Sequence, residues 1–231
     1  MSSKIIGYKS RWSNIGVIDA PTIFDIGSDD LLIELSYIAL NPIDVKKKAF
    51  ALIPRTRYVG KEFSGTVRKV GSSLSTEWKP GDRICGFLNS PLASVALGTW
   101  TKININEQAV MRSPSTLNDL EAASFPLTFS TALELLERTS KRGALLVLGG
   151  GSNVGSYVIQ LARYKYNFTE IFATCSSRSS TFVQSLGATP LDYKDPDLSK
   201  GFLTLGTKFD SVLDTVGGYS ALQVWPQILK R

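Results

Sequence analysis

The strongest constraint on the fold is an apolar run that leads directly into a glycine-rich loop. Residues 144–148 are all apolar, and the loop that follows contains Gly149, Gly150, Gly151 and Gly155. Beyond the loop, apolar residues recur at helical spacing, at Val154, Val158, Leu161 and Ala162. Such a stripe packs one face of a helix against a sheet. The segment is therefore predicted to fold as a buried strand, a tight turn and a helix.

The chemistry of this loop favours an anionic ligand. Backbone N–H groups at the start of a helix point into the turn and can bind phosphate. Glycine lets the backbone approach the phosphate closely and adopts positive φ at little cost. The residues expected to bind a pyrophosphate are Gly150, Gly151, Ser152, Asn153, Val154 and Gly155. The alternative interpretation is a tight strand-to-helix turn that binds nothing.

Strands and helices alternate through the rest of the C-terminal half. Strands are predicted at 171–174, 189–191 and 209–213, with one helix ending near Leu186 and Gly187 and a helix-like stretch at 220–229. This alternation is typical of a doubly wound parallel sheet. It strengthens the prediction that the glycine loop belongs to a dinucleotide site.

The N-terminal half has a different sequence pattern. Short β-rich pieces at 5–8, 31–39, 64–70 and 83–87 are separated by glycine and proline turns, which predicts a small barrel or sandwich. Asn118 and Glu121 then form a capping-box pattern before a helical stretch that is interrupted at Pro126. We expect an α/β chain with a β-rich domain over residues 1–122 and a Rossmann domain over residues 123–231.

Composition narrows the classes of function. The net charge is +6, but the only run of three basic residues is Lys46, Lys47 and Lys48, which we interpret as a solvated face. No aromatic-basic platform is apparent, so nucleic acid is not an expected partner. No apolar run reaches the roughly 18 residues of a membrane helix, so no integral membrane segment is expected. The separated Cys85 and Cys175 and the lack of a secretory signal favour a cytoplasmic protein, with the mitochondrion as the alternative.

Several short motifs also occur in an order found in one protein family. They are Asn41-Pro42-Ile43-Asp44, Gly60-Lys61-Glu62-Phe63-Ser64-Gly65, Gly81-Asp82-Arg83, Gly98-Thr99-Trp100, the glycine loop, Leu186-Gly187-Ala188 and Asp214-Thr215-Val216-Gly217-Gly218. With these motifs the chain resembles the medium-chain dehydrogenase/reductase superfamily, specifically its zinc-free quinone oxidoreductase-like branch, and is similar to fungal members. The resemblance implies a GroES-like catalytic domain followed by a Rossmann domain. It also implies hydride transfer to a quinone or to an activated alkene or carbonyl.

The resemblance assigns roles to individual residues. Asn41 and Thr131 match positions that face the nicotinamide and the substrate, and they are the expected catalytic residues. The alternatives are that Asn41 only forms a turn before Pro42 and that Thr131 is a buried helix residue. Catalysis would then depend on orientation, with water or a tyrosine delivering any proton, and the sequence identifies no proton donor.

No metal site is expected. Zinc-dependent relatives take their metal ligands from cysteine and histidine, whereas this chain has no histidine. Lys61 stands before Glu62, where those relatives place a metal ligand. Two cysteines cannot assemble either a Cys/His site or a four-cysteine site.

The end of the chain raises a separate expectation. It follows soon after the fourth predicted Rossmann strand, whereas a complete fold of this type has further strands. We therefore expect an incomplete Rossmann domain with an open sheet edge, which leaves the chain unstable or aggregation-prone or is covered by a second copy or another partner. The leading hypothesis is an NADPH-dependent oxidoreductase. The alternative is a catalytically inactive NADPH-binding or interaction scaffold of the same fold.

The choice of NADPH depends on residues that follow the second Rossmann strand. Sites that prefer NADH carry a carboxylate roughly 20 residues past the loop, where it binds the ribose 2′-hydroxyl. Here that position holds Ser176, Ser177 and Arg178, which can bind a 2′-phosphate. Tyr193 resembles the family's other neighbour of this phosphate. The alternative is that the serines cap the next helix and that Arg178 lies in solvent.

Overall fold

The computed structural model describes residues 4–10, 12–19, 25–49, 57–89, 99–139, 142–196, 198, 208–217 and 229. The chain divides into two compact units, Met1–Leu127 and Thr128–Arg231. The predicted boundary at 122/123 lies a few residues earlier, within helix α2 (Asp119–Ser124).

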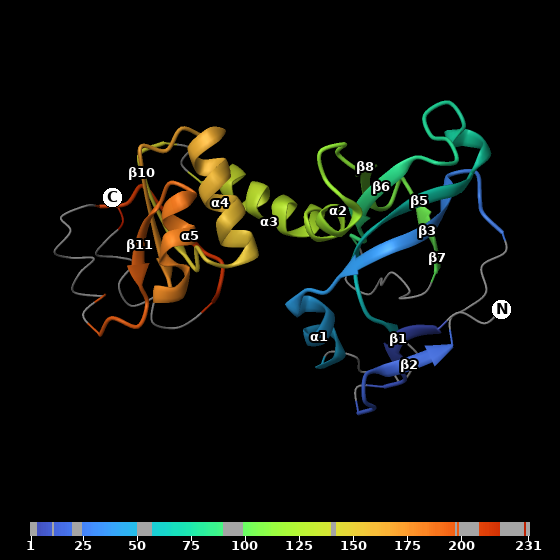
Figure 1. The fold of residues 1–231 in the computed structure, drawn as a ribbon, viewed down its shortest axis with the longest axis horizontal. Coiled ribbons are helices and arrows are strands. Elements are labelled where there is room, and N and C mark those ends of the chain that lie inside the picture. Colours follow the sequence, from blue (N-terminus) through green and yellow to red (C-terminus); the bar gives the residue numbers. More distant parts are fainter. Residues whose placement is uncertain are drawn as a thin grey trace. The chain divides into compact units, whose positions relative to one another are not determined.

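The first unit is built on two antiparallel sheets (Figure 1). The larger sheet has the order β7-β3-β5-β6-β8 and the smaller one the order β2-β1-β4. The strands of the larger sheet are β3 (Asp30–Ala39), β5 (Glu62–Val70), β6 (Arg83–Phe87), β7 (Trp100–Asn104) and β8 (Ala109–Arg112). Those of the smaller sheet are β1 (Lys4–Tyr8), β2 (Gly16–Asp19) and β4 (Arg57–Tyr58). The strands predicted in this half are confirmed.

Alternating side chains build the core of this unit. Leu31 and Ile33 on β3 and Phe63 and Val67 on β5 share one face, because every second residue of a strand points the same way. Trp78 packs against the same cluster. The unit also contains the helices α1 (Pro42–Ala49), η1 (Ser72–Leu74) and α2.

The predicted capping box begins α2. Asn118 Oδ1 accepts a hydrogen bond from the Glu121 N–H at 3.0 Å, and Glu121 Oε2 accepts one from the Asn118 N–H at 2.9 Å. Both hydrogen bonds of the capping box are formed, so the prediction is confirmed. The helix α3 (Pro126–Glu137) follows, and it begins at the predicted interruption.

The second unit contains a four-stranded parallel sheet in the order β11-β10-β9-β12. Its strands are β9 (Ala144–Leu148), β10 (Glu170–Cys175), β11 (Thr189–Asp192) and β12 (Ser211–Asp214), and its further helices are α4 (Asn153–Tyr164), η2 (Ser177–Ser179) and α5 (Ser180–Ser185). The chain runs from β9 through β10 to β11 on one side of the sheet and then returns to the other side of β9 at β12. Ligands of open α/β sheets bind at such a switch point, beyond the carboxyl ends of the strands. The Rossmann-type sheet is confirmed.

Residues of β9 are buried on both faces of this sheet. Leu145 and Val147 join a cluster that includes Val158 of α4 and Val183 of α5, whereas Leu146 joins a cluster on the other face. A strand buried on both sides has a continuous apolar run, which is the pattern seen in the sequence. The predicted helical stripe of α4 packs in the first of these clusters.

The last predicted strand is displaced. β12 begins at Ser211 rather than at residue 209, because Asp210 pairs with the start of β9 through both its backbone and its side chain. Phe209 instead forms an isolated parallel bridge with Leu229. Of the helix predicted at 220–229, only Leu229 is among the described residues, and its bridge is not helical.

Candidate functional site

The glycine loop is held by the neighbouring strand β10. Thr174 accepts a hydrogen bond from the Gly150 N–H through its carbonyl oxygen at 2.8 Å and one from the Gly149 N–H through Oγ1 at 2.9 Å. Gly149 has a φ of +86°, a conformation that favours glycine. The loop is therefore fixed at the carboxyl end of β9, at the switch point between β9 and β12.

Two further glycines allow the helix to approach the strand. A Cβ on Gly150 would collide with Ala173, and a Cβ on Gly155 would collide with the Gly149 carbonyl oxygen. A Cβ on Gly151 would lie 3.0 Å from the side chain of Ser179. The loop thus keeps the backbone of α4 close to β9 and leaves its N-terminal amides uncovered by side chains at these positions.

The Ser152 hydroxyl forms hydrogen bonds to groups within the protein. Ser152 is the N-cap of α4, and its Oγ accepts a hydrogen bond from the Gly155 N–H at 3.0 Å. The same oxygen lies 3.1 Å from Thr215 Oγ1, which donates to the Leu148 carbonyl at 2.8 Å. Because the Thr215 proton is used there, Ser152 is the donor between the two hydroxyls. The side chain of Ser152 therefore joins the loop to the end of β12.

Three backbone donors at the loop remain for a ligand. Asn153 and Val154 are the first residues of α4, so their N–H groups have no intrahelical acceptor. Among the described residues, no acceptor faces these two groups or the Gly151 N–H. Unpaired N–H groups at a helix N-terminus are complementary to a phosphate.

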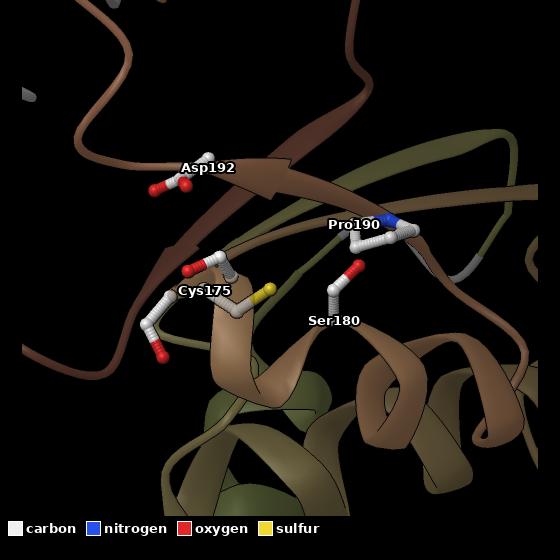
Figure 2. A pocket seen from close by; sticks show the side chains of 6 residues that line it. Cys175, Ser180, Pro190 and Asp192 are labelled. Carbon is white, nitrogen blue, oxygen red and sulfur yellow. The ribbon is translucent and has the colours of Figure 1, made fainter.

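A pocket of about 320 Å³ opens beside the end of β10. Figure 2 shows Pro190 and Asp192 on β11, Ser180 at the start of α5, and Cys175 between these two elements. Ser176 and Ser177 complete the lining. Burial raises the pKa of the Cys175 thiol, and the Asp192 carboxylate raises it further, so this cysteine stays protonated.

Of the four residues predicted to select NADPH, Ser176 and Ser177 line this pocket, whereas Arg178 and Tyr193 are not among its lining residues. Ser176 Oγ lies 3.2 Å from Ser179 Oγ, and Ser176 makes no side-chain cap bond at the start of η2. Arg178 is exposed, and the described part of the chain gives it no hydrogen bond or ion pair. Tyr193 is also exposed, and its N–H donates to the Cys175 carbonyl at 3.1 Å.

Sequence reasoning missed Asp192 as part of this pocket. It pairs with Cys175 in the parallel register of β10 and β11, and its Oδ1 accepts a hydrogen bond from the Lys194 N–H at 2.9 Å. The signal was its position at the end of the third predicted strand, where parallel strands bring their carboxyl ends together. Its charge opposes a bound phosphate.

The two predicted catalytic residues lie in different units. Asn41 precedes α1, and its Nδ2 donates to Glu62 Oε2 at 2.9 Å. Because a carboxylate only accepts, the amide nitrogen of Asn41 faces Glu62, and Asn41 Oδ1 remains as an acceptor. Thr131 lies on α3 in the second unit and is exposed, so its interpretation as a buried helix residue is wrong.

Polar side chains are buried around Asn41 in the first unit. Asp44 Oδ2 accepts a hydrogen bond from the Asn41 N–H at 2.9 Å, and Glu62 Oε1 accepts one from the Leu127 N–H at 2.7 Å. Asp44, Lys61 and Glu62 are only 3%, 7% and 1% exposed. Burial lowers the pKa of Lys61, and the nearby Asp44 carboxylate partly offsets that effect.

The described residues contain neither a cluster of metal ligands nor a membrane-spanning helix. No group of three or more His, Cys, Asp and Glu side chains among them could hold a metal ion. No helix in the same part of the chain has the length and apolarity needed to cross a bilayer.

The parallel sheet with its switch-point glycine loop and the β-rich first unit together give the two folds found in proteins of the alcohol dehydrogenase type. Residues 27–102 match the alcohol dehydrogenase GroES-like domain. The solved structure of the quinone oxidoreductase from Coxiella burnetii is similar, with a TM-score of 0.84 and 26% identity, covering 100% of this chain and 73% of that one.

Two curated relatives agree with this class. The chain is 36% identical over 213 residues to the 2-methylene-furan-3-one reductase of Solanum lycopersicum, covering 87% of this chain and 53% of that protein. It is 33% identical over 205 residues to the chloroplastic NADPH-dependent alkenal/one oxidoreductase of Arabidopsis thaliana, covering 84% of this chain and 51% of that protein. The chain thus spans about half the length of these relatives. It belongs to the medium-chain dehydrogenase/reductase superfamily and is quinone oxidoreductase-like.

Proposed function

We propose that this protein is an NADPH-dependent reductase that transfers a hydride to a quinone or to an activated alkene or carbonyl. The observation that carries the proposal is the set of three unpaired N–H donors, on Gly151, Asn153 and Val154, at the switch point of the parallel sheet. A dinucleotide pyrophosphate presents oxygen acceptors suited to these donors.

The loop residues fit this group. Gly150 and Gly155 hold α4 close to β9, and the absence of a side chain on Gly151 leaves its N–H open to an oxygen acceptor. Ser152 supports the loop by capping α4 and by its hydrogen bond to Thr215. The phosphates would therefore bind the backbone N–H groups rather than this hydroxyl. When bound, the nucleotide supplies the hydride, and the residues of the chain bind and orient it.

The preference for NADPH rests on charge and donors beside the pocket. Arg178 can make a charge-assisted pair with a 2′-phosphate, and Ser176 and Ser177 can donate to the same group. Asp192 lines the pocket and works against a phosphate, so the preference depends on Arg178 outweighing it. The name of the Arabidopsis relative, an NADPH-dependent enzyme, supports the same choice.

The acceptor is inferred from the relatives. Their names specify a furanone reductase, an alkenal/one oxidoreductase and a quinone oxidoreductase, and methylene-furanones, enones and quinones share a conjugated carbonyl group. Asn41 and Thr131 remain the proposed residues near the nicotinamide and the acceptor. Among the described residues, Asn41 belongs to a buried polar network, which suits it to holding a fixed orientation.

Oxidation of NADPH by a small 1,4-quinone and by an α,β-unsaturated ketone tests this function. We expect turnover with NADPH and a higher KM with NADH. The Arg178→Asp variant should raise the KM for NADPH and leave kcat nearly unchanged, because the proposed role of Arg178 is to bind the 2′-phosphate, away from the reacting atoms. NADPH binding without turnover of either acceptor would instead support a nucleotide-binding scaffold, and the absence of NADPH binding would contradict both functions.

A further inference from the structure

The pocket in the second unit contains a carboxylate that a preference for NADPH does not explain. Asp192, at the end of β11, lies in the parallel register beside Cys175 at the end of β10. Ser176 and Ser177, which follow β10, line the same pocket of about 320 Å³. Figure 2 shows the Asp192 side chain on β11, with Cys175 between it and Ser180 of α5. The strand beside β10 therefore supplies a carboxylate to this pocket, whereas β10 itself supplies none.

No cation balances this carboxylate in the described part of the chain. None of the six described lining residues is basic, and Asp192 forms no ion pair with another described residue. Its Oδ1 accepts a hydrogen bond from the Lys194 N–H at 2.9 Å, which fixes the side chain and leaves Oδ2 as a further acceptor. Because a carboxylate only accepts, the group that it binds in the pocket must be a hydrogen-bond donor.

The ribose hydroxyls of an adenosine are donors of this kind. Sites that prefer NADH bind the ribose 2′-hydroxyl with a carboxylate that follows the second strand of the sheet. That part of this chain holds Ser176, Ser177 and Arg178, so the usual carboxylate is missing, and Asp192 offers one from the adjacent strand. NADH has two free hydroxyls on this ribose. In NADPH the 2′-oxygen carries a phosphate, and only the 3′-hydroxyl can donate.

We propose that Asp192 accepts a hydrogen bond from a hydroxyl of the adenosine ribose, and that the protein therefore binds NADH as well as NADPH. This inference rests on the proposed function, because it concerns the nucleotide of the same reaction. Asp192 favours NADH by accepting from its hydroxyls and by repelling a 2′-phosphate. Arg178 favours NADPH through a charge-assisted pair with that phosphate. Because the two residues act in opposite directions, the preference for NADPH stays modest.

Two diphosphates that differ only in the ribose test the hydroxyl contact separately from the 2′-phosphate. Calorimetry would measure the binding of ADP and of 2′,3′-dideoxy-ADP, which keeps the pyrophosphate but lacks both hydroxyls. Wild type should prefer ADP by roughly 10-fold or more, as expected for one hydrogen bond to a charged group. In Asp192→Ala that preference should disappear, because the acceptor is gone.

The ratio of the NADPH and NADH affinities gives a second readout, in the variant Asp192→Asn. The amide oxygen can keep the bond to the Lys194 N–H, so the melting temperature should stay near wild type, while an N–H₂ donor replaces Oδ2. NADPH affinity should rise by roughly 5-fold, the effect of removing one of two unit charges about 4 Å apart in water, and NADH affinity should fall.

A matched variant controls for the loss of charge alone. Asp195→Asn removes the same charge from an exposed residue of the same segment, and Asp195 is not among the residues that line the pocket. Both the preference for ADP over dideoxy-ADP and the ratio of the NADPH and NADH affinities should stay near wild type in this variant.

The outcomes separate this inference from the proposed function. Equal binding of the two diphosphates to wild type, or a preference for ADP that persists in Asp192→Ala, would overturn the inference. An unchanged ratio of the NADPH and NADH affinities in Asp192→Asn would also overturn it. If wild type prefers ADP and binds NADH but not NADPH, the contact of Asp192 with the ribose would stand while the proposed NADPH-dependent function fails. Wild type that binds none of these nucleotides would contradict both.

Discussion

The packing of the glycine loop depends on single glycines, and at Gly155 the group that leaves no room for a side chain is backbone. A methyl group there would overlap the Gly149 carbonyl oxygen, which is backbone and cannot rotate away. Gly155→Ala is expected to lower the free energy of unfolding by about 1–3 kcal/mol, the range for an overpacked site. Gly16→Ala is the control, because a Cβ there meets nothing within 4 Å, and its effect should stay within about 0.5 kcal/mol. Denaturant unfolding measures both, and equal losses would contradict this packing.

Lys61 gives stability a defined pH dependence. Burial lowers its folded-state pKa below the ordinary value of 10.5, so between those two values the unfolded chain binds more protons than the folded one. Stability therefore rises with pH in that window, and the burial penalty is fully present below it. Lys61→Met should be more stable than wild type near neutral pH, with the gain shrinking as the pH approaches 10.5.

The comparison must be made between the two proteins rather than on wild type alone. The pKa of Tyr166 is raised to about 12 by burial and by its hydrogen bond to Glu137, so wild-type stability loses a contribution above about pH 10. This effect is common to both proteins and cancels in the difference. Denaturant unfolding at several pH values measures that difference, and a gain that is constant with pH would contradict a lowered Lys61 pKa.

At the scale of elements, helix α4 depends on the cap at its first turn. Ser152→Ala removes the acceptor for the Gly155 N–H and should lower the free energy of unfolding by about 1 kcal/mol. Ser156→Ala is the control, because the Ser156 hydroxyl donates to the Asn153 carbonyl and caps no free amide. The loss in the free energy of NADPH binding should be smaller than the loss in the free energy of unfolding. A large loss of NADPH affinity with unchanged stability would show that the hydroxyl binds phosphate instead of capping the helix.

Elements with a strong local pattern could be predicted from the sequence. The strand at 144–148, the capping box at Asn118 and the interruption at Pro126 each follow from neighbours within a few residues. Asp192 could not be placed beside Ser176, because the register of β11 on β10 is set by contacts between distant residues. The opposed charges of Asp44 and Lys61 escaped prediction for the same reason, since α1 and β5 meet only in the folded unit. Local patterns therefore predict the glycine loop, whereas the positions of these charged side chains depend on tertiary packing.

At the scale of the whole molecule, the chain is expected to hold no stoichiometric zinc. It has no histidine and two cysteines, and Lys61 stands where a metal ligand would be needed. Elemental analysis of the purified protein should find far less than one zinc per chain, and chelators should change neither its melting temperature nor any turnover. About one tightly bound zinc per chain would contradict this expectation.

The central claim is that this chain binds NADPH in preference to NADH, and calorimetric titration of both nucleotides tests it most directly. Wild type should bind NADPH more tightly, and Arg178→Asp should weaken NADPH selectively by about 1.5–3 kcal/mol, the value of a lost charge-assisted hydrogen bond. Arg142→Asp makes the same charge change on an exposed residue that precedes β9, at the amino end of the parallel strands, and should leave the ratio of the two affinities unchanged. Equal affinities in wild type, or the same loss in both variants, would contradict the account.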